Sequence, residues 1–89
     1  MKNKNNDEKI IIDLLNIINK LLKKYKKNIK KKQVKIPFYS SGILDSLDFV
    51  NLIEQIEKKY NFKFNLSEID VDITIQDLSK LVLRKKNEQ

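Results

Sequence analysis

The chain contains no cysteine, no histidine and no tryptophan, and it has one glycine and one proline. The missing cysteine excludes disulfides and thiol nucleophiles, and the missing histidine excludes imidazole bases. Together, these absences exclude zinc sites built from thiolate or imidazole ligands. The remaining polar residues show no spacing typical of an acid–base pair or a metal site. The sequence therefore predicts a protein that is not an enzyme, and any chemistry must come from hydroxyls, carboxylates, lysines or a group attached later.

The chain also lacks a long hydrophobic run. The apolar run Ile10–Ile12 ends at Asp13, which is too early for the hydrophobic region of a secretory signal peptide. No stretch approaches the roughly 20 apolar residues that span a bilayer. We therefore expect a cytoplasmic protein.

Positive charge is concentrated in the first part of the chain. Nineteen basic and 12 acidic residues give a net charge of +7 over 89 residues. Residues 1–35 hold 12 lysines and three acidic residues, whereas residues 36–89 hold seven basic and nine acidic residues. Arg84 is the one arginine, which disfavours arginine-based reading of nucleic-acid bases.

The lysine-rich segment leaves two interpretations open. In the first, a helix packs its apolar side on the rest of a monomer while its lysines face solvent. In the second, the chain is a small basic interaction protein that binds anionic membrane, an acidic partner or nucleic acid through this helix. Of these ligands, nucleic acid is the least favoured. Surplus apolar surface would also allow a dimer.

Hydrophobic periodicity predicts one all-α domain over residues 9–86. Apolar residues that recur every three or four positions predict a first helix over about residues 9–30. The only proline and glycine lie in a long ordered loop that follows, over residues 33–44. We expect residues 1–8 to form a flexible arm and residues 87–89 to be frayed.

The second half of the chain predicts three further helices. The second helix should run from Ser46 to Tyr60 and end at Asn61. A short helical turn should follow over 65–70, and Thr74 should cap the last helix. The predicted fold is thus a small four-helix bundle with three main helices, one short helix and a long loop between the first and second. The apolar face predicted for the second helix comprises Leu47, Val50, Leu52, Ile53, Ile56 and Tyr60. Three acidic residues are predicted to lie outside this face: Asp48, Glu54 and Glu57.

The segment Gly42–Asp48 places a serine hydroxyl, Ser46, where a loop meets a helix. Unpaired backbone N–H groups and the helix dipole favour a covalently attached phosphate at such a position. Asp45 is placed to help hold Mg²⁺ during a phosphoryl transfer. We expect Leu47 to anchor the helix start in the core, so that Ser46 faces outward. A simpler interpretation also stays open, in which Asp45 or Ser46 only caps the helix.

The stretch from Phe38 to Val82 resembles the acyl carrier proteins, a phosphopantetheine-binding family, and the first helix resembles them more loosely. The resemblance rests on Gly42, on the run Asp45–Asp48 and on apolar residues of the following helix. The opening of the last helix at Thr74 and Ile75 matches as well. Further matching positions are Val50, Leu52, Ile53, Glu57, Tyr60, Asp77, Leu78, Leu81 and Val82.

This resemblance implies that Ser46 carries a 4′-phosphopantetheine arm, transferred from coenzyme A by a phosphopantetheinyl transferase with the help of Asp45 and Mg²⁺. An acyl or aminoacyl group would travel on the arm as a thioester, loaded by a ligase and passed to downstream transferases. The family also includes the carriers of fatty acid biosynthesis. Partner enzymes would dock on the helix after the serine, through Leu47 and the carboxylates of Asp48, Glu54 and Glu57.

Three features depart from the fatty-acid carriers. Asn51 stands where those carriers usually have glutamate, and Lys58 and Lys59 replace acids. Ile43 and Leu44 precede Asp45 in place of a shorter Gly-Ala pair, as in free-standing carriers of aminoacyl or specialised acyl groups, including the D-alanyl carrier. The resemblance therefore favours a carrier of a dedicated biosynthetic pathway.

Overall fold

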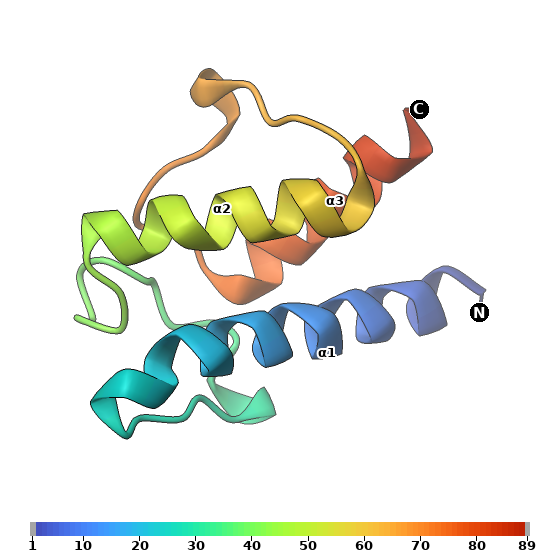
Figure 1. The fold of residues 1–89 in the computed structure, drawn as a ribbon. Coiled ribbons are helices and arrows are strands. Elements are labelled where there is room, and N and C mark those ends of the chain that lie inside the picture. Colours follow the sequence, from blue (N-terminus) through green and yellow to red (C-terminus); the bar gives the residue numbers. More distant parts are fainter. Residues whose placement is uncertain (1, 89) are drawn as a thin grey trace.

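Three α-helices make up most of the protein. The computed structural model describes the backbone of residues 2–88 and the side chains of residues 8–65 and 67–88. The helices are α1 (Lys2–Leu22), α2 (Ser46–Tyr60) and α3 (Ile75–Asn87), as Figure 1 shows. Over the described residues there is no strand, and one isolated β-bridge joins Pro37 to Thr74. The predicted all-α bundle of acyl-carrier type is confirmed.

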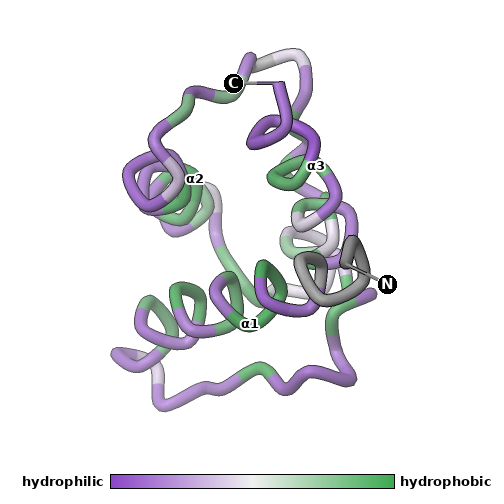
Figure 2. The backbone as a smooth tube through the Cα atoms, turned by 90° about the vertical axis from the view of Figure 1, so that its right-hand side faces the viewer, coloured by the Kyte–Doolittle hydropathy of each residue, from purple (hydrophilic) through white to green (hydrophobic). Residues whose placement is uncertain are grey.

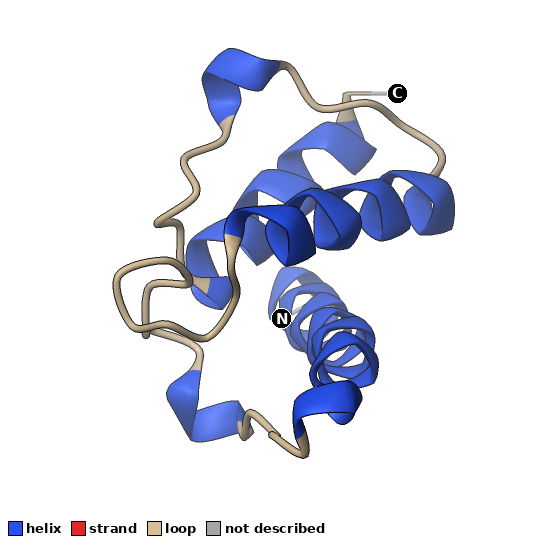
Figure 3. Cartoon of the chain, turned by 60° about the vertical axis from the view of Figure 1, so that its left-hand side comes forward, coloured by secondary structure: helices blue, strands red, loops and turns tan. Residues whose placement is uncertain are grey.

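Short 3-10 turns lie in the connections between the helices (Figure 3). The long connection from α1 to α2 contains η1 (Lys23–Tyr25) and η2 (Lys31–Gln33). The short fourth helix of the prediction is a single turn, η3 (Leu66–Glu68). The carboxylate of Glu68 holds this turn against α3, because it accepts hydrogen bonds from Arg84 and Lys85 at 3.0 and 2.9 Å.

The core lies where the three helices meet. In Figure 2, the hydrophobic sides of α1, α2 and α3 face one common interior, and α1 packs against both other helices. Each helix contributes apolar side chains at a spacing of three or four residues, which places them on one face. The fully or almost fully buried apolar set is Ile10, Leu14, Ile18, Leu22, Ile29, Phe38, Leu44, Phe49, Leu52, Ile56, Ile75, Leu78 and Val82.

The first helix differs from its predicted bounds. It begins at Lys2 and ends at Leu22, not near residues 9 and 30. The chain turns back after η1, where Lys26 adopts a left-handed conformation with φ 58°. Asn19 stabilises this return, since its side chain donates to the carbonyl of Ile29 at 3.1 Å and accepts from the Ile29 N–H at 2.8 Å. Ile29 therefore lies in the connecting loop, and its side chain is buried in the core. Tyr25, in η1, is 46% exposed.

The predicted chain ends fall partly outside the described residues. The helix covers residues 2–8, where an arm is predicted, but the side chains of residues 1–7 lie outside the description. The flexibility of this arm stays a prediction. At the other end, α3 continues to Asn87, and Gln89 lies outside the described residues.

The predicted limits of α2 and the start of α3 are confirmed. Asn61 ends α2 in the left-handed conformation, with φ 59°. Thr74 caps α3 by accepting a hydrogen bond from the Asp77 N–H at 3.1 Å. Both signals depend on residues close in sequence, which explains why they could be predicted. None of the described helices has the length and apolarity needed to cross a bilayer.

Candidate functional site

Ser46 is the first residue of α2, and its side chain is exposed. The helix is capped by Asp45, whose Oδ1 accepts a hydrogen bond from the Asp48 N–H at 2.7 Å. Within the described part of the chain, the Ser46 hydroxyl has no hydrogen-bond partner. The capping role therefore falls to Asp45 alone, and the Ser46 hydroxyl is available for reaction at the positive end of the helix dipole.

The loop before Ser46 is ordered by its own backbone hydrogen bonds. The N–H groups of Ile43 and Leu44 both donate to the carbonyl of Phe38, at 3.1 and 3.3 Å. Phe38 and Leu44 are buried and hold the loop on the core. Gly42 has φ 76°, a left-handed conformation that glycine adopts without steric cost. This loop thus fixes the position from which α2 begins.

Asp48 does not lie on an exposed acidic surface, and the expectation that it does is wrong. The residue is only 2% exposed. The carboxylate accepts a hydrogen bond from Lys24 Nζ at 3.0 Å and another from the Tyr25 hydroxyl at 3.0 Å. This bond to Asp48 is the main cause that raises the pKa of Lys24.

Asp48 therefore ties η1, which directly follows α1, to the beginning of α2, two residues from Ser46. Sequence reasoning missed Lys24 and Tyr25 as residues of this region. Lys24 is one of many lysines in its segment, and both residues lie more than 20 positions from Asp48. No local pattern could have identified them.

Leu47 does not anchor α2 in the core, contrary to the sequence-based expectation. It is 73% exposed, and Val50, one turn later, is 53% exposed. The core side of α2 is formed instead by Phe49, Leu52 and Ile56. Exposed apolar residues on one turn beside a candidate attachment site are typical of a surface that contacts other proteins.

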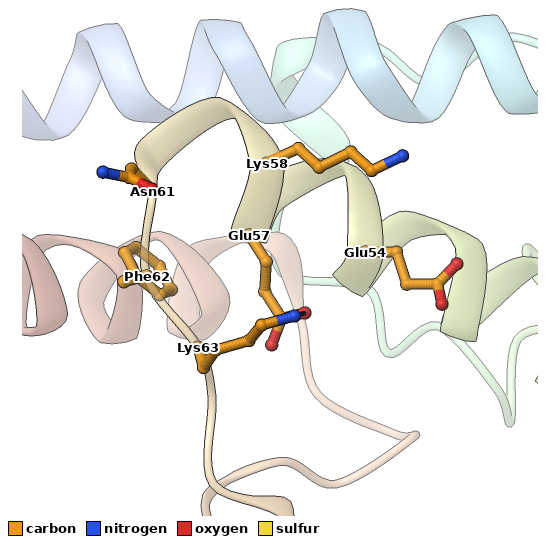
Figure 4. A pocket seen from close by; sticks show the side chains of 6 residues that line it. All are labelled: Glu54, Glu57, Lys58, Asn61, Phe62 and Lys63. Carbon is orange, nitrogen blue, oxygen red and sulfur yellow. Dashed lines mark ion pairs between the residues drawn. The ribbon is translucent and has the colours of Figure 1, made fainter.

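The two glutamates of α2 differ in their surroundings. Glu54 is exposed, as expected. Glu57 accepts a hydrogen bond from the Phe64 N–H at 2.9 Å and forms an ion pair with Lys63 at 3.7 Å, drawn in Figure 4. The Glu57 side chain is only 14% exposed, so it stabilises the turn after α2.

One cleft of the described structure lies away from Ser46. It has a volume of about 460 Å³ and is lined by residues of the last turns of α2 and of the segment that follows, including Glu54, Lys58 and Phe62 (Figure 4). Since α2 has 15 residues, its two ends are about 20 Å apart. Among the residues that the structure describes, no group of three or more acidic side chains is placed to hold a metal ion.

Residues 13–82 match the family model described as "Phosphopantetheine attachment site". The match covers most of the chain, from the middle of α1 to the middle of α3. The chain belongs to this family. Comparisons with curated proteins and with solved structures found no match.

Members of this family are carriers that hold a covalently attached 4′-phosphopantetheine and interact with partner enzymes. The start of α2 suits such a group, because an exposed hydroxyl without a partner lies beside the free N–H groups of a helix end. Carrier domains of this family generally do not catalyse reactions themselves.

Proposed function

We propose that this carrier holds an acyl or aminoacyl group as a thioester on a 4′-phosphopantetheine arm attached to Ser46. The observation that carries the proposal is the division of roles at the start of α2. Asp45 caps the helix, and the Ser46 hydroxyl is exposed and has no partner in the described structure.

Attachment would be a phosphoryl-type transfer from coenzyme A. Ser46 Oγ forms the new bond to the phosphorus of the phosphopantetheine and loses its proton to a base of the transferase. The pyrophosphate bond breaks, and 3′,5′-ADP leaves. The proposed role of Asp45 is to help hold the Mg²⁺ that neutralises the phosphates. The absence of cysteine means that the chain itself provides no thiol, so the thiol of the arm carries the cargo.

The proposed docking surface for partner enzymes comprises Leu47, Val50 and Glu54. All three are exposed on α2 near Ser46. The two apolar residues would supply the buried contact, and Glu54 would orient the partner. We do not include Asp48, which is buried, and we assign Glu57 mainly to the turn that it stabilises.

The pathway that we favour is a dedicated one, for an aminoacyl or specialised acyl group. Support comes from the charge of α2, where Lys58 and Lys59 offset the carboxylates of Glu54 and Glu57. The net charge of α2 is therefore small, and a partner that recognises a strongly acidic helix would bind it weakly.

The test of attachment is incubation with a phosphopantetheinyl transferase of broad specificity, Mg²⁺ and coenzyme A, followed by intact mass measurement. We expect a mass gain of one phosphopantetheine and none for Ser46→Ala. Ser67→Ala is the matched control, because Ser67 is also an exposed serine, and it should be modified like the wild type. Unmodified wild-type protein with several transferases would refute the proposal. The cargo would be identified by mass spectrometry of the carrier isolated from its native cells.

A second function, binding to an anionic surface, is supported by one observation. The lysines between residues 20 and 35 are all exposed, and no acidic residue lies among them. The apolar side of α1 is buried in the core, so membrane binding would depend on the lysines alone. Replacing Lys30, Lys31 and Lys32 with glutamine should then abolish salt-sensitive binding to vesicles containing anionic lipid, whereas replacing Lys58 and Lys59 should not. Equal binding by both variants would exclude this function.

A further inference from the structure

One cleft lies beside the start of α2, and a second cleft shares one wall with it. The smaller cleft, of about 210 Å³, has Tyr25, Asp45 and Asp48 among its lining residues. The larger cleft has a volume of about 360 Å³ and lies toward the segment that follows α1. Lys27, Gly42 and Ile43 line both clefts. The pair therefore forms a path that begins at Asp45, the residue before Ser46, and leads away from α2.

The entrance of this path favours an anion. Lys27 is exposed, and in the described structure its ammonium group forms no ion pair. The carboxylate of Asp48 is already paired with Lys24, and Asp45 accepts the N–H group that begins the helix. From residue 14 to residue 44 the chain has nine lysines and no acidic residue. The lysines of this segment outnumber the two carboxylates that line the smaller cleft, which favours an anion on this side of Ser46.

The larger cleft is lined by residues of a different kind. Leu22 and Ile29, which are almost fully buried, give it apolar walls, and the side-chain amides of Asn28 and Gln33 also line it. The Asn19 side chain fixes the backbone of Ile29 through two hydrogen bonds, so this wall is already formed. Beyond the carboxylates of Asp45 and Asp48, the path thus presents the Lys27 ammonium group, then apolar groups with amides.

The groups of the prosthetic arm complement those of the path in the same order. A phosphodiester with one negative charge links it to serine, a branched segment with two methyl groups and a hydroxyl follows, and two amides precede the thiol. We propose that the 4′-phosphopantetheine arm, when no partner is bound, lies in these two clefts with its phosphate paired to Lys27. This inference rests on the proposed attachment to Ser46.

The consequence concerns the accessibility of the docking surface. Leu47 and Val50 do not line either cleft. An arm that lies against the segment after α1 therefore leaves the exposed face of α2 free for a partner. The partner would bind that face first and then withdraw the arm from the lysine side. Lys27 would position the arm by pairing with its phosphate.

The absence of cysteine makes a direct experiment available. After enzymatic attachment, the thiol of the arm is the only thiol in the protein, so a nitroxide spin label with a thiol-reactive group attaches there and nowhere else. We expect amide NMR signals of Asn28, Ile29 and Gln33 to broaden, and those of Glu54 and Glu57 to stay sharp. Unlabelled protein should show amide shift changes between the free and modified forms at residues 27–29 and 41–43.

Lys27→Gln tests the anchor, and Lys23→Gln is its matched control. Lys23 is an exposed lysine of the same segment that lines neither cleft. We expect Lys27→Gln to lose most of the broadening and to move the ³¹P signal of the phosphodiester, and Lys23→Gln to behave like the wild type. A normal mass gain with shift changes confined to residues 45–47 would overturn the resting place but not the attachment. No mass gain at all would overturn both.

Discussion

The hydroxyl of Tyr25 donates a hydrogen bond of 3.0 Å to Oδ2 of Asp48, across 23 positions of the chain. The other oxygen of the same carboxylate binds Lys24. A buried carboxylate is stable only when such partners replace its water. This contact joins η1, which follows α1, to the first turn of α2, and Tyr25 and Asp48 both line the smaller cleft.

Replacing Asp48 should therefore destabilise the fold. We expect Asp48→Ala to lower the free energy of unfolding by about 1 to 3 kcal/mol, because two hydrogen bonds to a charged group are lost. Glu54→Ala is the control on the same helix, and its effect should stay within about 0.5 kcal/mol. Urea unfolding followed by circular dichroism measures both values. Equal stability of the two variants would show that the contact with Lys24 and Tyr25 contributes little.

Asp45 has one structural and one proposed chemical role, and two substitutions separate them. Asp45→Asn keeps an oxygen that accepts the Asp48 N–H, so its stability should remain within about 0.5 kcal/mol of the wild type. Asp45→Ala loses the cap and about 1 kcal/mol. Both variants should be modified more slowly at limiting Mg²⁺, measured as the rate of mass gain with coenzyme A. If Asp45→Asn is modified at the wild-type rate, the Mg²⁺ role is refuted, and helix capping remains as the role of Asp45.

Tyr60 should give the protein a stability that declines at alkaline pH. Partial burial, followed by its hydrogen bond of 2.8 Å to Asp13, raises the pKa of Tyr60 well above its ordinary value near 10. The unfolded chain then releases this proton at a lower pH than the folded chain. The contribution is complete below about pH 10 and is lost as the pH rises through the higher folded value.

Tyr60→Phe isolates this effect. The variant should lose about 0.5 to 1.5 kcal/mol of unfolding free energy at pH 7, because one hydrogen bond is removed. The difference from the wild type should shrink above pH 10, measured by urea unfolding at pH 7 to 11. Tyr39→Phe, at an exposed tyrosine, serves as the control. A difference that stays constant with pH would contradict the assignment.

Leu47 and Leu52 lie on opposite sides of α2 and should respond differently to substitution. Leu47 is 73% exposed, so Leu47→Ser should change the unfolding free energy by no more than about 0.5 kcal/mol. Leu52 is fully buried, and Leu52→Ala should cost about 2 to 5 kcal/mol. With the transferase, Leu47→Ser should raise KM while the fold stays intact. An unchanged KM would remove Leu47 from the proposed docking surface.

The parts of the site that depend on neighbouring residues could be predicted from the sequence. The limits of α2, its end at Asn61 and the cap at Thr74 follow from residues within one turn. The Gly42–Asp48 segment likewise pointed to an exposed Ser46 at a helix start, although the expected reason, an inward Leu47, was wrong.

Other features depend on contacts between distant residues. A helical pattern assigns residues to a face, but it does not determine which face the neighbouring helices cover. For this reason, the apolar residues Leu47 and Val50 were assigned to the core, and Asp48 to the surface. The end of α1 at Leu22 was also missed, because it depends on the return of the chain to Asn19.

The sequence by itself determined a helical chain with a serine at a helix start and no thiol of its own, because local hydrogen bonding, periodicity and composition set these features. Its resemblance to the acyl carrier proteins pointed to a carrier. Only the tertiary structure decided what surrounds that serine. Burial of Asp48, exposure of Leu47 and the clefts beside Lys27 arise when segments more than 15 residues apart pack together, and the packing free energy of the whole core selects that arrangement.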